Sequence, residues 1–332
     1  MKLNPVYGKE VKLRVRTVKF ALTIFFYNLI LIGIALFGFE VFFNIQWNAQ
    51  IDYSGAARVY FIITCFEAIM VIFLIPVFTA GSIAGEREKQ TLEILLTTIL
   101  KPQQIVIGKL MSSISMVLLL ILSSLPVVSI VFTIGGVGMT DLLQFVVTVF
   151  VMSLYVGSIG MFASSFLKKT LQAIVFSFGM VVIICIVTAV FVLFANAFAN
   201  MYYYNVMGGK GIVPDVSWAG YVLLINPAFT IINMSVEQYG SESLAFELFR
   251  GLNTPLSGAA GGGLSNAVNS FVMNHWLIIS LLCQLLITAL LLKMSARFLN
   301  PLRRRKEKER KESKKARKKK KRGDADEEDS GF

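Results

Sequence analysis

The sequence predicts an all-α polytopic membrane protein with six transmembrane helices and both termini in the cytoplasm. Three observations predict this fold class. First, the 332-residue chain is 55% hydrophobic and 16% charged, with a mean hydropathy of +0.69. A soluble domain usually carries about 25% charged residues, so this composition excludes an ordinary cytosolic enzyme. The other two observations are six long apolar segments and a very uneven distribution of Lys and Arg.

The six apolar segments have the length that a membrane requires. A transmembrane helix needs about 20 predominantly apolar residues. Five segments exceed this length, and the shorter sixth has Trp276 and Lys293 at its two ends, which can reach the interfaces. The segments are Phe20–Phe43, Tyr60–Ile83, Leu110–Ile134, Leu142–Leu167, Leu171–Phe198 and Trp276–Leu292.

The positions of Lys and Arg orient these segments. With the N-terminus inside, 29 of the 32 basic residues lie on the cytoplasmic side, and only Arg58, Lys210 and Arg250 lie outside. Cytoplasmic loops of membrane proteins carry an excess of Lys and Arg. The sequence therefore predicts cytoplasmic N- and C-termini.

Residues 1–19 are predicted to form a cytoplasmic amphipathic interface helix. Asn4 and Pro5 are typical of the N-cap and first position of a helix. Apolar residues then recur at helical spacing among Lys and Arg, as in a helix that lies on a membrane surface. The alternative is a short basic flank that only sets the topology. The apolar residues are Tyr7, Val11, Val15, Val18 and Leu22.

A transmembrane domain over residues 20–299 is expected to have a large outer loop at 199–275. Within this loop, Trp218–Met234 is apolar but short, and Asn226-Pro227 interrupts it. A seventh span here would place the basic C-terminal segment outside. We therefore expect a re-entrant or interfacial segment instead.

Residues 300–332 form a tail with strong charge segregation. Fifteen Lys and Arg lie within residues 303–322, and five acids follow within 324–329. Such a composition predicts disorder, and the basic run predicts binding to anionic lipid. Nucleic-acid binding is not expected, because the basic pI comes mainly from this tail.

The first cytoplasmic loop, residues 84–109, contains a cluster of charges followed by a short apolar face. Gly81 and Gly85 are expected to loosen the preceding helix end, and Pro102 separates the loop from the next span. Charges on one side and leucines on the other suit the docking of a soluble partner. The alternative is a solvated connection between spans.

This loop resembles a known family. Residues Ile83–Thr98 read I-A-G-E-R-E-K-Q-T-L-E-I-L-L-T-T, followed by K-P-Q-Q-I-V-I-G-K. They are similar to the membrane subunit of an ABC-2 type exporter, of the sodium/multidrug-efflux permease kind. Other features agree with this resemblance. They are Asn4-Pro5 with Lys9-Glu10 at the start, Pro76 in the second span, Asn226-Pro227 after the fifth span, and six spans with a large outer loop before the sixth. The resemblance covers about residues 1–300.

The resemblance implies a type V exporter-like fold and a transport subunit that is not itself an enzyme. Such a permease forms the translocation pathway with a second permease, either identical or related. Separate ATPase subunits hold ATP and Mg, and this chain binds no cofactor. Consistent with this, the sequence has no G-x-x-x-x-G-K-[ST] phosphate loop. The implied ATPase-coupling residues are Gly85, Glu86, Arg87, Glu88, Lys89, Thr91, Leu92, Glu93, Leu95 and Leu96.

Two features lie within the spans. Glu67 is the acid deepest in a span, so it must face protein or water, or be protonated. It is a candidate for the substrate pathway, and the alternative is an interhelical hydrogen bond. Small residues on one face of the fourth span favour close helix packing. These are Ser153, Gly157, Gly160 and Ser164.

Two other function classes were weighed against the exporter. A secondary transporter or channel that does not use ATP also fits six spans with an intramembrane acid. A membrane-bound lipid enzyme would need clustered His, Asp or Arg, whereas His275 is the only histidine. No metal site is expected. We expect a multi-pass protein of the cell membrane, in bacteria the plasma membrane. Sodium, a peptide, a drug-like amphiphile, a lipid and a glycan are all compatible substrates.

Overall fold

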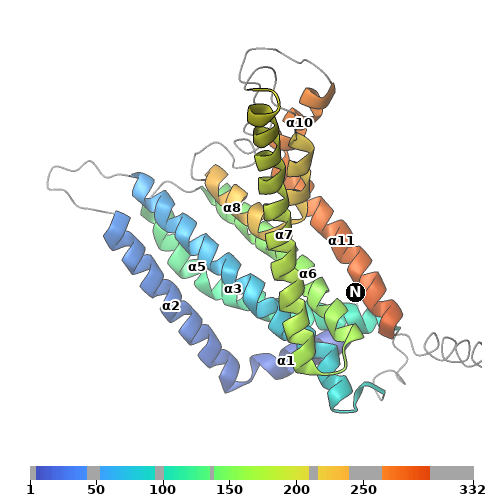
Figure 1. The fold of residues 1–332 in the computed structure, drawn as a ribbon. Helices are drawn as coiled ribbons and strands as arrows, with labels where there is room; N and C mark the ends of the chain where they lie inside the picture. The colour runs from blue at the N-terminus through green and yellow to red at the C-terminus, as the bar shows by residue number, and fades with distance from the viewer. Residues whose placement is uncertain are drawn as a thin grey trace, which may run out of the picture.

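The computed structural model describes residues 5–42, 53–93, 101–134, 138–208, 216–238 and 264–299, and these form helices without any strand among them (Figure 1). Residues 1–4, 43–52, 94–100, 135–137, 209–215, 239–263 and 300–332 lie outside this described part. In chain order the helices are α1 (Pro5–Val15), α2 (Val18–Phe42), α3 (Tyr53–Glu88), α5 (Pro102–Ile134), α6 (Met139–Phe166), α7 (Thr170–Asn205), the 3-10 helix η1 (Ser217–Ile225), α8 (Pro227–Gln238), α10 (Leu264–Asn274) and α11 (Trp276–Leu299).

Six helices in the described residues, α2, α3, α5, α6, α7 and α11, are long and apolar enough to cross a membrane. This confirms the predicted all-α polytopic fold. The helices extend beyond the apolar segments, because α3 continues into the charged residues up to Glu88 and α5 begins at Pro102. Of the predicted loop at 84–109, residues 84–88 therefore belong to α3 and residues 102–109 to α5.

The expectation that Gly81 and Gly85 loosen the end of α3 is wrong. Both lie in uninterrupted helix. Their role is in packing, since a Cβ atom added at Gly81 or Gly85 would lie 3.4 or 3.5 Å from the Thr170 side chain at the start of α7. The absence of side chains here brings α3 close to α7, so these glycines fix a helix contact.

Helix α6 lies at the centre of the bundle. It is the most enclosed span, with 72% of its most apolar stretch buried against 17% in α7 and α11. Helix α2 lies at one edge beside α3 and α5, and α11 lies at the opposite edge (Figure 1). The main core joins α3, α5, α6, α7 and α8 through residues such as Ile75, Ile121 and Val156.

The small residues of α6 face α3. A Cβ atom added at Gly160 would lie 2.0 Å from the Thr79 hydroxyl, and one at Gly157 would lie 2.7 Å from a Leu110 methyl group. The Ser164 hydroxyl accepts hydrogen bonds from the backbone N–H groups of Ile83 and Ala84 at 3.0 and 2.8 Å. Ser153 is also buried, and its hydroxyl donates to Val149 within α6.

The apolar segment in the outer loop forms a bent pair of helices, η1 and α8, which meet at 103°. Asn226 holds the corner, because its side-chain Nδ2 donates to the Thr188 hydroxyl of α7 at 2.8 Å and its side-chain Oδ1 accepts from the Phe229 N–H at 3.1 Å. Thr230 continues this contact by sharing a hydrogen bond of 2.7 Å with Ser280 of α11. The bent pair has the geometry of a broken span or a re-entrant loop.

An even number of spans brings α1 and the end of α11 to the same end of the bundle (Figure 1). In the described residues every Lys and Arg except Arg58 belongs to the helix ends and connections found there. We call it the basic end. The preference of cytoplasmic segments for Lys and Arg predicts that this end faces the cytoplasm.

Candidate coupling site at the basic end of the bundle

Helix α3 ends in a tight turn at the basic end. The backbone N–H of Gln90 donates to the Arg87 carbonyl at 3.2 Å, and that of Thr91 donates to the Glu86 carbonyl at 2.9 Å. This pair of hydrogen bonds is a Schellman motif, whose turning residue adopts a left-handed conformation. Gln90 does so, with φ of 60°. The motif stops α3 and redirects the chain into residues 91–93.

Glu86, in the last turn of α3, forms part of a buried charge cluster. The Lys109 ammonium group of α5 donates to a Glu86 carboxylate oxygen at 2.6 Å and to a Glu10 oxygen of α1 at 2.8 Å. It also donates to the Ser82 carbonyl at 3.2 Å, while the Ser112 hydroxyl donates to the other Glu10 oxygen at 2.5 Å. The Lys109 side chain is only 2% exposed. This charge cluster joins α1, α3 and α5.

Arg87 connects α3 to the end of α6. Its guanidinium group donates to the carbonyl oxygens of Leu167 at 2.6 Å and Ser165 at 3.0 Å. The last carbonyls of a helix have no partner within the helix, so a cation there both completes their hydrogen bonding and interacts favourably with the helix dipole. Arg87 therefore caps the C-terminus of α6.

Glu88 connects α3 to the beginning of α7. One carboxylate oxygen accepts from the Thr170 N–H at 3.1 Å and from the Thr170 hydroxyl at 2.6 Å. An acidic group at a helix N-terminus accepts from a free backbone N–H and complements the positive end of the dipole. Three consecutive charged residues thus bind three different parts of the bundle.

The short apolar face beyond α3 is partly covered by this chain itself. Leu92 is buried in a cluster with Ile105 and Leu110 of α5 and Leu299 of α11, so it anchors the turn rather than offering an open docking surface. Lys89, Gln90, Thr91 and Glu93 are exposed around it. Leu95 and Leu96, the other predicted coupling leucines, lie outside the described residues.

Glu67 lies inside the protein, far from this site along α3. It is fully buried and accepts a hydrogen bond from the Ser124 hydroxyl of α5. The side chain of Tyr27 on α2 lies beside it. These contacts place the carboxyl group between three helices, which favours the interhelical hydrogen bond over a contact with substrate.

The whole described chain matches one family. The profile of ABC-2 family transporter proteins matches residues 5–296, nearly the full length. The chain belongs to the ABC-2 transporter family. No curated protein matches it significantly. As an ABC-2 membrane protein, it is a multi-pass permease component of an ABC transporter, and the family is a transport component rather than an enzyme.

Within this ABC-2 permease, sequence reasoning missed three residues of the charge cluster. Lys109 and Glu10 lie in segments that carry the family resemblance, but no contact with Glu86 was predicted for either, and Ser112 belongs to no motif. A lysine within the first turns of a long apolar helix, however, must find acidic partners or reach water. Among the described residues no group of His, Cys, Asp and Glu is arranged to hold a metal ion.

Proposed function

We propose that this chain is the permease subunit of an ATP-driven exporter, and that the end of α3 transmits movement from a separate ATPase subunit. In this proposal ATP and Mg bind to that partner. Membership of the ABC-2 family supports this assignment, and this chain has no phosphate-loop motif of its own. A second permease, identical or related, completes the translocation pathway.

The observation that carries the proposal is the set of connections at Glu86, Arg87 and Glu88. Through them the end of α3 is bonded to α1, α5, α6 and α7. A force applied at the exposed turn beyond α3 therefore reaches four other helices through short polar contacts. Packed helices respond to such a force by rigid-body movement rather than by local deformation.

The predicted coupling residues differ in their contacts, and we assign different roles to the two groups. The exposed residues Lys89, Thr91 and Glu93 form the surface that the ATPase contacts. Glu86, Arg87 and Glu88 are occupied within this chain, so they transmit movement rather than dock the partner. Exposed charges without a role in the bundle can steer a partner, whereas charges bonded to neighbouring helices are suited to transmit its movement.

Two double variants test this division. Lys89→Glu with Glu93→Lys reverses the exposed charges and should prevent capture of the partner ABC ATPase. Glu86→Ala with Arg87→Ala should retain part of that capture but abolish ATP-dependent transport, because it removes both the Glu86–Lys109 ion pair and the Arg87 cap of α6. Capture is measured by pull-down from membranes, and transport by uptake of sodium or a fluorescent amphiphile into inverted vesicles.

Glu40→Lys is the matched control, because it reverses one exposed charge on α2 at the far end of that helix. It should leave capture and transport unchanged. Full capture and full transport by both double variants would place the coupling site elsewhere. Transport that follows an ion gradient without ATP would support a secondary transporter instead.

A further inference from the structure

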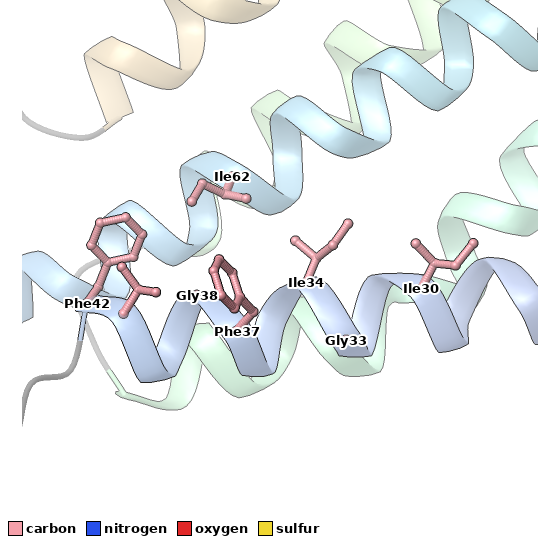
Figure 2. Close-up of a pocket in the computed structure, with 8 residues that line it drawn as sticks. Ile30, Gly33, Ile34, Phe37, Gly38, Phe42 and Ile62 are labelled. Atoms are coloured by element: carbon pink, nitrogen blue, oxygen red, sulfur yellow. The ribbon is translucent and has the colours of Figure 1, made fainter.

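A membrane-exposed apolar groove lies between α2 and α3, away from the coupling site. Its volume is about 380 Å³, and it is lined almost entirely by carbon (Figure 2). In Figure 2 the side chains of Ile30, Ile34 and Phe42 on α2 and Ile62 on α3 lie along its length. The groove opens on the surface of the bundle, so a ligand can enter it sideways from the lipid.

Two glycines of α2 create the space. Gly33 is exposed, and a Cβ atom added there would meet no protein atom within 4 Å, so it would project into open space. Gly38 is buried against Val59 of α3, where an added Cβ atom would lie at 3.4 Å. The residues that line the groove run along α2 from Ile30 to Phe42, which suits an extended hydrocarbon chain.

A cation stands at the end of this groove that lies farthest from the basic end. The Arg58 guanidinium carbon lies 5.8 Å from the centre of the Phe42 ring, and Phe42 lines the groove. Arg58 is exposed at the beginning of α3. Guanidinium groups stack on aromatic rings and match the geometry of phosphate, so the apolar groove and the cation together resemble the two halves of a phospholipid.

We propose that this groove binds one acyl chain of an anionic phospholipid whose phosphate lies against Arg58. The hydrophobic effect does not select the ligand, because lipid tails are as apolar as the groove. Close packing of the chain and the charge of the headgroup supply the preference. With the basic end in the cytoplasm, the bound lipid belongs to the outer leaflet. The basic tail at residues 303–322 is then on the other side of the membrane.

Photo-crosslinking tests the proposal on the full-length protein. The chain is reconstituted in nanodiscs of phosphatidylcholine that contain a trace of phosphatidylglycerol with a diazirine in one acyl chain, or of phosphatidylcholine with the same group. After irradiation, labelled peptides are mapped by mass spectrometry. Labelling of residues 30–42 should exceed labelling of the exposed face of α7, which reports ordinary surrounding lipid. It should favour the anionic probe about fivefold, which corresponds to about 1 kcal/mol for one basic residue near anionic lipid.

Variants separate the chain from the headgroup. Gly33 lines the groove and has room for a Cβ atom, so Gly33→Leu should occupy part of the groove and reduce labelling by both probes. Gly179→Leu is the matched control, since Gly179 on α7 also has no protein atom within 4 Å of an added Cβ atom. Arg58→Gln should remove the preference for the anionic probe, whereas Arg58→Lys should keep most of it.

Three outcomes would overturn the proposal. Equal labelling of α2 and α7 would mean ordinary contact with bulk lipid, and unchanged labelling in Gly33→Leu would mean that no chain enters the groove. An anionic preference that survives Arg58→Gln would place the headgroup elsewhere. Absence of lipid adducts, together with cysteine crosslinks between α2 helices of two copies, would identify a second copy of this chain as the occupant.

Discussion

Lys109 is the residue whose replacement tests the charge cluster most severely. Lys109→Met keeps the length and apolar stem of the side chain but removes its charge. The two carboxylates of Glu10 and Glu86, each within 2.8 Å of the ammonium nitrogen, then face one another without a cation. The variant should therefore release α1 from α5 and loosen the end of α3.

The expected cost follows from the burial of the partners. Breaking a fully buried ion pair by removing one member costs about 3–5 kcal/mol. The side chains of Glu10 and Glu86 are 19% and 28% exposed, so water can solvate part of their charge. We therefore expect a loss of about 3 kcal/mol in the free energy of unfolding, at the lower end of that range. Lys101→Met, which removes an exposed charge one residue before α5, should have little effect.

Three measurements follow this change. Thermal unfolding of the detergent-purified protein reports stability, and hydrogen–deuterium exchange should rise in residues 5–15 and 85–93. A double-mutant cycle with Glu86→Gln should then give a clear coupling energy, because the two side chains are in direct contact. An unchanged unfolding temperature, or additive effects in the cycle, would refute the interpretation of Lys109 as the link between these helices.

Three further predictions follow from the packing. Gly160→Ala should lower stability by about 1–3 kcal/mol because the new methyl group overlaps the Thr79 hydroxyl; Thr79→Ala should partly restore the unfolding temperature, and Gly179→Ala should be neutral. Glu67→Gln should keep normal transport because the amide oxygen still accepts a hydrogen bond, whereas Glu67→Leu should reduce the yield of folded protein. Loss of transport in a folded Glu67→Gln variant would instead indicate a role in the substrate pathway. Gln90→Gly should raise the unfolding temperature and Gln90→Val should lower it, since a left-handed conformation costs a side-chain-bearing residue about 1–2 kcal/mol; equal temperatures would contradict the role of the turn.

The spans could be predicted from sequence because a bilayer imposes one simple requirement. Long apolar runs must be helical there, since no water is present to satisfy backbone polar groups. The ends of the helices were less predictable. Hydropathy falls where α3 enters the charged residues, yet the helix continues to Glu88 because its side chains bond to α5, α6 and α7. These are tertiary contacts that no local pattern contains.

The sequence predicted which segment couples to a partner, but not which contacts its side chains make. The family resemblance implied that Glu86, Arg87 and Glu88 couple to an ATPase, and the structure shows all three bound to neighbouring helices. Leu92 was expected to be part of a surface that docks a partner, but residues of α5 and α11 cover it. Both outcomes depend on which helices meet at the basic end, and helical spacing within a single segment carries no information on that point.

The central claim is that a separate ATPase docks at the turn beyond α3, and site-specific photo-crosslinking measures this contact directly. A benzophenone amino acid is placed at Lys89 or Glu93, both exposed at the basic end, and at Tyr204, which is exposed at the opposite end of α7. The account predicts adducts with the mass of this chain plus one ABC ATPase from positions 89 and 93 and none from position 204. Equal adducts from all three positions, or ATPase capture without any adduct from 89 and 93, would contradict it.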